Sequence, residues 1–267
     1  MTDPTRPSSL SSLFDLSGRV AIVTGGSRGL GAEFAEGLAE AGASLMLCAR
    51  RDVWLTPATA AMRSKGFAAE SMRADVTNEA DVQAVVSATI ARFGRVDILV
   101  NNAGVSWGER PEAMTLAQWQ KVIDVNLTGA FLFSQAAGRE MLKRKSGCII
   151  NVASIAGFQG NVNGPYYAGY AASKAGLMGL SRDLATSWGR DGIRVNAIAP
   201  GFFHSRLSDS SIKMAERGIA QTTPLGRVGA AGELKGVVVF LASDAASYIT
   251  GQTLVVDGGG TIATGFY

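Results

Sequence analysis

The 267-residue chain has only two cysteines and one histidine. Cys48 and Cys148 both lie in apolar runs, which indicates buried free thiols and not a disulfide or a metal site. We therefore expect no metal, and a cytoplasmic location in a reducing environment. The single histidine, His204, is predicted to be a polar residue of a loop, with a contact to a bound small molecule as the alternative.

The chain also lacks an apolar run long enough to span a bilayer, and its start lacks the apolar core of a signal peptide. Residues 1–17 are rich in Ser, Thr and Pro and predict a flexible tail. The net charge of +3 comes from dispersed Lys and Arg, so no nucleic-acid or membrane partner is predicted. A hydrophobic content of 47% supports a substantial core, and no break in composition divides residues 18–267, which we predict to form a single domain.

Short apolar runs alternate with longer segments of helical period, which is typical of an α/β fold with a parallel sheet covered by helices on both faces. Strands are predicted at 19–24, 44–49, up to about 74, 97–101, 148–153, 194–199 and 253–256. Helices are predicted at 29–42, 54–65, 78–93, 115–143, up to about 188 and 231–242. Residues 205–224 are predicted to form an irregular or short-helical insert.

Tyr170 and Lys174 are four residues apart in a predicted helix, and Ser154 precedes them. On a helix this spacing places both side chains on one face. A positive neighbour favours the phenolate, so we expect the lysine to lower the tyrosine pKa from its usual value of about 10. Such a tyrosine can donate a proton to an alkoxide or take one from an alcohol. The pattern therefore predicts a site that reduces carbonyl groups.

Gly25, Gly29 and Gly31 follow the first predicted strand and begin the first long helix. Glycines there permit a tight turn, close approach of the backbone to a pyrophosphate, and anion binding at the helix start. The second strand ends without the acidic residue that binds the ribose hydroxyls of NAD, and Arg50 with Arg28 suits a ribose phosphate instead. This favours NADP, although two solvated arginines are the simpler alternative and the nearby Asp52 keeps NAD as a possibility.

These residues resemble the short-chain dehydrogenase/reductase family, from about Leu16 to Gly260. Five ordered motifs carry the resemblance: the glycine loop at 24–31, Asp75 in Ala-Asp-Val, Asn-Asn-Ala-Gly at 101–104, Asn126 in Asp-Val-Asn-Leu, and the Tyr-x-x-x-Lys pair. Pro-Gly at 200–201 and Val-Asp-Gly-Gly at 256–259 also agree. The family implies a Rossmann-like, doubly wound sheet of seven parallel strands and commonly a homotetramer.

The resemblance also implies roles for individual residues. Tyr170 is implied as the general acid and base, Lys174 as the group that binds the nicotinamide ribose, and Ser154 as the donor to the substrate carbonyl. Asn126 is implied to hold a water that links Lys174 to solvent, with a plain helix hydrogen bond as the alternative. Cofactor contacts are implied for Gly25, Ser27, Arg28, Gly29, Leu30, Gly31, Arg50, Asp75, Val76, Asn102, Ala103, Gly104, Tyr170, Lys174, Pro200, Gly201, Phe203 and Ser205.

The loop between Ser154 and Tyr170 departs from the family pattern, because the two residues are about three positions further apart than usual. No other serine or threonine occurs between Ile155 and Gly169, so Ser154 remains the candidate. Tyr166 and Tyr167 lack a lysine four residues later, so we interpret them as pocket-lining or surface aromatic residues. Residues 205–224 are predicted to form a lid over the substrate.

The leading hypothesis is an NADP-dependent oxidoreductase that interconverts a ketone and a secondary alcohol. Residues 13–18 are similar to the start of gluconate 5-dehydrogenases, while the general pattern is equally similar to 3-oxoacyl thioester reductases. The alternative is a sensor or scaffold that binds the cofactor without turnover.

Overall fold

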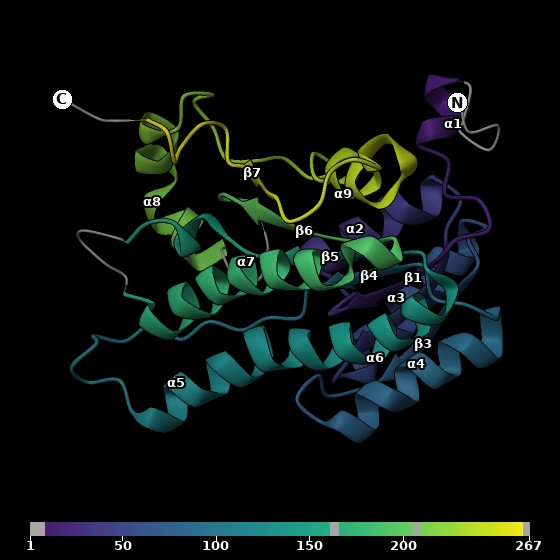
Figure 1. Ribbon diagram of the computed structural model, residues 1–267. Coiled ribbons are helices and arrows are strands. Elements are labelled where there is room, and N and C mark those ends of the chain that lie inside the picture. Colours follow the sequence, from purple (N-terminus) through teal and green to yellow (C-terminus); the bar gives the residue numbers. More distant parts are fainter. Residues whose placement is uncertain (1–8, 161–165, 205–208, 264–267) are drawn as a thin grey trace.

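The computed structural model describes residues 9–160, 166–204 and 209–263, with side chains for all of these except 209–215. Seven parallel strands form one sheet in the order β3-β2-β1-β4-β5-β6-β7 (Figure 1). Their bounds are β1 Val20–Thr24, β2 Ser44–Ala49, β3 Ala69–Arg73, β4 Ile98–Asn101, β5 Gly147–Val152, β6 Ile193–Pro200 and β7 Thr253–Val256. The seven predicted strands are therefore confirmed, with ends that shift by one or two residues at most.

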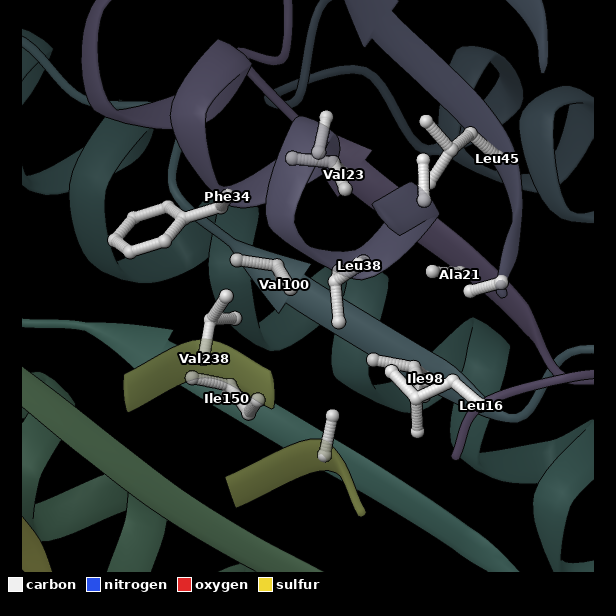
Figure 2. Packing of buried hydrophobic residues seen from close by; sticks show 14 of the residues in the cluster. Leu16, Ala21, Val23, Phe34, Leu38, Leu45, Ile98, Val100, Ile150 and Val238 are labelled. Carbon is white, nitrogen blue, oxygen red and sulfur yellow. The ribbon is translucent and has the colours of Figure 1, made fainter. Parts of the chain in front are cut away.

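Helices cover both faces of this sheet. The bounds are α1 Leu10–Leu13, α2 Gly29–Glu40, α3 Asp52–Ser64, α4 Glu79–Phe93, α5 Leu116–Ile123, α6 Gly129–Arg144, α7 Ala168–Trp188, α8 Asp209–Thr222 and α9 Lys235–Ala242. Two large apolar clusters form among the described residues, one on each face, because successive strand side chains point to opposite faces. Val23 packs with α2 and α9, as Figure 2 shows, whereas its neighbour Ile22 packs with residues of α4 and α6.

The strand order reverses between β1 and β4, since the chain passes from β1 outward to β3 and then returns. At such a switch point the loops that follow the two central strands diverge to opposite faces of the sheet. This leaves a crevice at the carboxyl ends of β1 and β4. The glycine loop follows β1 and the Asn-Asn-Ala-Gly segment includes the end of β4, so both predicted cofactor motifs lie at this crevice.

The long helix predicted over 115–143 is interrupted. Thr115 and Gln118 form the predicted capping box, and α5 begins after it. Residues Asp124–Thr128 then form a π-helix that contains Asn126, and α6 follows. A single π turn inside an α-helix is frequent at functional sites.

Two residues before the predicted boundary after residue 17 pack against the domain. Leu16 is fully buried in the cluster with α2, and its backbone N–H donates to the carbonyl of Ala41 at 2.8 Å. Phe14 contacts Phe240 of α9 with ring centroids 6.5 Å apart. The serine-rich composition of this segment gave no indication that these two apolar residues pack against the domain. Residues 1–8 lie outside the described part of the chain.

Cys48 and Cys148 are free and buried, on β2 and β5. Burial raises the pKa of the Cys48 thiol to about 12 and also raises that of Cys148. Within the described part of the chain, no helix has the length and apolar character needed to cross a membrane.

Candidate active site

A cavity of about 710 Å³ lies at the carboxyl ends of the central strands. Most of the predicted site residues line it. They are Gly25, Ser27, Arg28, Gly29, Leu30, Gly31, Arg50, Val76, Asn102, Ala103, Gly104, Ser154, Tyr170, Lys174, Pro200, Gly201 and Phe203. Asp75 and Asn126 lie outside the cavity lining, and Ser205 lies outside the described residues.

The glycine loop has backbone conformations that explain its sequence. Gly25 and Gly29 have positive φ values of 64° and 53°, which side chains with a Cβ rarely adopt. A Cβ on Gly31 would lie 2.3 Å from the Gly25 carbonyl oxygen, so no other residue fits there without moving the loop. The loop runs directly into the amino end of α2, where free N–H groups favour an anion such as a pyrophosphate.

The Asn102 segment is fixed against the glycine loop by hydrogen bonds. The backbone N–H groups of Asn102 and Ala103 both donate to Thr24 Oγ1 at 3.0 Å. The Asn102 side chain donates to the carbonyl of Thr24 at 2.9 Å. These bonds join the ends of β1 and β4 and hold the two walls of the crevice together.

The predicted catalytic residues converge in this cavity. Tyr170 and Lys174 lie on one face of α7, and the Lys174 Nζ atom is 5.5 Å from the centroid of the tyrosine ring. The same Nζ donates to the carbonyl of Val152 at the end of β5, at 2.6 Å. Ser154 follows this strand and hydrogen-bonds Tyr170. The lengthened loop has therefore not separated the serine from the tyrosine.

The expected fall in the Tyr170 pKa is not found in the structure. Burial raises the Tyr170 pKa, and the hydrogen bond with Ser154 only partly opposes this. The lysine is itself buried, and this lowers the pKa of Lys174 to about 8. The two residues are close as predicted, but desolvation, together with the nearby Tyr167, raises the Tyr170 pKa more than Ser154 lowers it. Tyr170 is therefore a neutral phenol at neutral pH, the form that can donate a proton.

Asn126 lies outside the cavity lining, and its side-chain polar atoms form hydrogen bonds with other residues of the chain. Its Nδ2 donates to the Val105 carbonyl at 2.9 Å and to Ser173 Oγ at 3.0 Å, and its Oδ1 accepts from the Val105 N–H at 2.8 Å. The side chain thus ties the loop after β4 to α7. The predicted water beside Lys174 remains a prediction.

Basic side chains line the cavity at the carboxyl end of β2. Arg28, Arg50 and Arg51 all face it, whereas Asp52 begins α3 outside the lining. Arg50 lies 3.7 Å from Asp75, whose pKa is raised by burial but lowered more by hydrogen bonds from Thr77 and by the charge of Arg50. These donors fit a phosphate on the cofactor ribose better than bare hydroxyl groups.

Sequence reasoning missed two residues at this end. Of the two arginines that follow β2, only Arg50 was predicted to contact the cofactor, but Arg51 also lines the cavity. Trp54 was treated as a packing residue, yet it lines the cavity and the Arg28 guanidinium carbon lies 5.0 Å from its ring centroid. The helix α3 begins at Asp52, two residues before the predicted start, and this places Trp54 in the first turn beside the cavity.

The opposite end of the cavity has aromatic walls. Tyr166, Tyr167 and Phe202 line it, and the rings of Tyr167 and Tyr170 meet edge to face at 6.4 Å. His204 is exposed and is not part of the lining. Among the described residues, no cluster of three or more His, Cys, Asp or Glu side chains is placed to hold a metal ion.

Comparisons with known proteins agree with this geometry. Residues 25–261 match the family model described as enoyl-(acyl carrier protein) reductase. A 3-oxoacyl-[acyl-carrier-protein] reductase of Synechocystis is 41% identical, over 91% of this chain and 97% of its own length. A gluconate 5-dehydrogenase of Burkholderia cenocepacia, solved with NADP and tartrate, superimposes with a TM-score of 0.91 at 38% identity, covering 96% of this chain and all of that one.

A short-chain type dehydrogenase/reductase of Mycobacterium marinum also superimposes with a TM-score of 0.91, at 36% identity, over 95% of this chain and 99% of its own. Such coverage includes the glycine loop, the sheet and the helix that carries Tyr170 and Lys174. By sequence, by fold and by the residues gathered in its cavity, the chain belongs to the short-chain dehydrogenase/reductase family and is an oxidoreductase.

Proposed function

We propose that the protein reduces a ketone to a secondary alcohol with NADPH, and catalyses the reverse reaction with NADP. The observation that carries this proposal is the convergence of Tyr170, Lys174 and Ser154 on one cavity with the glycine loop. A sensor or scaffold would need only the glycine loop and the arginines. A buried lysine beside a tyrosine that lines the cavity is costly to maintain without chemistry, which favours the enzyme over that alternative.

NADPH, when bound, supplies the hydride to the carbonyl carbon. The Ser154 hydroxyl donates to the carbonyl oxygen, where negative charge grows during the reaction, so it stabilises the transition state more than the ground state. Tyr170 gives its proton to the same oxygen, which completes the alcohol and leaves a tyrosinate. Lys174, 5.5 Å from the ring, then stabilises that negative charge until the proton returns.

The cofactor residues form the other half of the proposal. The glycine loop and the start of α2 hold the pyrophosphate, and Arg28, Arg50 and Arg51 bind the ribose phosphate that distinguishes NADP from NAD. The bound NADP of the Burkholderia gluconate 5-dehydrogenase supports this assignment. We also propose that residues 205–224 form a lid; residues 205–208 lie outside the described part of the chain, and α8 makes up most of the remainder.

The aromatic end of the cavity supports a neutral substrate. The charged residues in the described lining are Arg28, Arg50, Arg51 and Lys174, and all belong to the cofactor end or to the catalytic pair. Tyr166, Tyr167 and Phe202 instead offer flat apolar surfaces at the other end. We therefore propose that the substrate is a neutral ketone with a ring, and that sugar acids and acyl thioesters are poorer substrates.

The assembly and the location are further parts of the proposal. Membership of the family supports a homotetramer, and we propose one catalytic domain in each subunit, predicted over residues 18–267. Exposed Phe131 on α6 and Leu254 on β7 are suitable contact residues between subunits. Buried free thiols support a cytoplasmic location.

The test is a turnover panel with NADPH and NADH over neutral cyclic and aryl ketones, sugar keto acids and 3-oxoacyl thioesters. Tyr170→Phe should remove most ketone reduction while NADP affinity, measured by calorimetry, stays within about a few fold. Tyr248→Phe is the matched control, since Tyr248 is fully exposed. Full activity in Tyr170→Phe would reject the proton donor, and absence of turnover across the panel with NADP still bound would overturn the proposed function.

A further inference from the structure

Trp54 has an unusual position for a large aromatic residue. It lies in the first turn of α3, directly after the cofactor end of β2. The buried side of that helix consists of Leu55, Thr59 and Met62, and Leu55 is only 1% exposed. Trp54 is 47% exposed, so packing in the core does not explain why a large aromatic residue stands at this position. Its ring instead borders the cavity beside Arg28.

The contact with Arg28 has the geometry of a cation–π interaction. The guanidinium carbon lies 5.0 Å from the ring centroid, within the range of about 6 Å in which the ring attracts a cation. Arg28 is also the residue before α2, and its extended backbone is set by the glycine loop. Its backbone is therefore fixed while its side chain is long and rich in rotamers. A planar ring beside the guanidinium is one of the contacts that restrict that freedom.

We infer that Trp54 is a positioning residue for cofactor selectivity: it holds the Arg28 guanidinium in place for the ribose phosphate of NADP. This inference rests on the proposed function, because it assumes NADP in the cavity. Trp54 acts through Arg28 and needs no contact with the cofactor.

The neighbouring arginine shows why an aromatic partner suits this task. Arg50 lies 3.7 Å from the carboxylate of Asp75, and such a contact compensates part of its positive charge. A phosphate must compete with that carboxylate for Arg50. The ring of Trp54 is neutral, so it orients Arg28 without offering a rival negative charge. An orientation fixed before binding also reduces the entropy that Arg28 loses when it meets the phosphate.

Two other roles for Trp54 make different predictions. If the ring contacts the adenine, its loss should weaken NADP and NAD equally, because both cofactors carry adenine. If the ring only stabilises α3, its loss should lower the unfolding midpoint without changing selectivity. The proposed role requires a selective loss that disappears when Arg28 is absent.

The experiment measures binding of adenosine 2′,5′-bisphosphate and of adenosine 5′-monophosphate by calorimetry, with no turnover needed. Trp54→Ala should weaken the bisphosphate by about 3- to 30-fold. It should change the monophosphate by no more than about twofold. Trp54→Phe should recover part of the loss, because a smaller aromatic ring still attracts the guanidinium. Val53→Ala is the matched control, since Val53 is the exposed neighbour outside the cavity lining.

The double variant Arg28→Ala/Trp54→Ala completes the cycle. If Trp54 acts through Arg28, this variant should bind the bisphosphate no worse than Arg28→Ala alone. Equal loss for both nucleotides, or a further loss in the Arg28→Ala background, would overturn the inference. A wild-type protein without preference for the bisphosphate would overturn it as well. A clear preference for the bisphosphate together with no ketone turnover would reject the proposed function and leave the role of Trp54 intact.

Discussion

Replacing Lys174 with methionine should make the protein more stable at pH 7 while it abolishes turnover. Burial lowers the Lys174 pKa from 10.5 to about 8. A shift of one pKa unit corresponds to about 1.4 kcal/mol, so keeping this ammonium buried and charged costs about 3 kcal/mol at neutral pH. Methionine has a similar length without charge. It loses the 2.6 Å hydrogen bond to the Val152 carbonyl, which is worth about 1 kcal/mol, so the expected net gain is about 2 kcal/mol.

The gain should depend on pH in a defined direction. Below pH 8 both the folded and the unfolded wild type bind the proton, and the full cost of burial is present. Between about pH 8 and 10.5 the unfolded state holds more protons than the folded state, so wild-type stability rises with pH. The advantage of Lys174→Met should therefore shrink across this window and reverse above it, where only the lost hydrogen bond remains.

The assay is equilibrium urea unfolding followed by far-UV circular dichroism, at fixed protein concentration and at a series of pH values from 7 upward. Lys121→Met is the matched control, because Lys121 is an exposed lysine on α5 outside the cavity lining. A Lys174→Met protein that is less stable than wild type at pH 7 would refute the reasoning. So would an advantage that stays constant while the pH passes through the window.

Three further changes test other parts of the structure. Arg50→Ala should weaken NADPH much more than NADH in binding titrations, and an equal loss for both cofactors would contradict a phosphate contact. Gly31→Ala should lower both NADP affinity and the unfolding midpoint, because its Cβ would lie 2.3 Å from the Gly25 carbonyl oxygen; unchanged values for both would show that the loop can shift freely. Leu16→Ala should cost about 2–5 kcal/mol of unfolding free energy in urea titrations, whereas a loss below about 0.5 kcal/mol would mean that this residue belongs to the tail.

The sheet was predictable because its strands are short apolar runs separated by helical segments, and the ends of β2 and β7 match the prediction in full. The glycine loop and the Tyr170–Lys174 pair were predictable because each needs a particular residue at a fixed spacing. The position of Trp54 at the cavity was not predictable, because it depends on where α3 begins. A helix start is known from sequence only to within a few residues.

Three other features needed the packed structure. Whether Leu16 is buried depends on what covers it, and its neighbours in sequence are polar or exposed. The residues of the π-helix at Asp124–Thr128 give no signal that separates a π turn from an α turn, and tertiary contacts such as those of Asn126 hold this segment. The direction of the Tyr170 pKa follows from the competition between desolvation and the hydrogen bond with Ser154, and burial cannot be computed from a spacing of four residues.

The two shielded thiols have a practical consequence. At neutral pH almost none of Cys48 is in the thiolate form that reacts with alkylating agents or peroxide, because its pKa lies near 12. Neither sulfur belongs to the cavity lining, so inactivation by a maleimide would report opening of the fold and not damage to the catalytic centre. The rate of labelling at these two cysteines therefore measures how often the sheet unfolds locally.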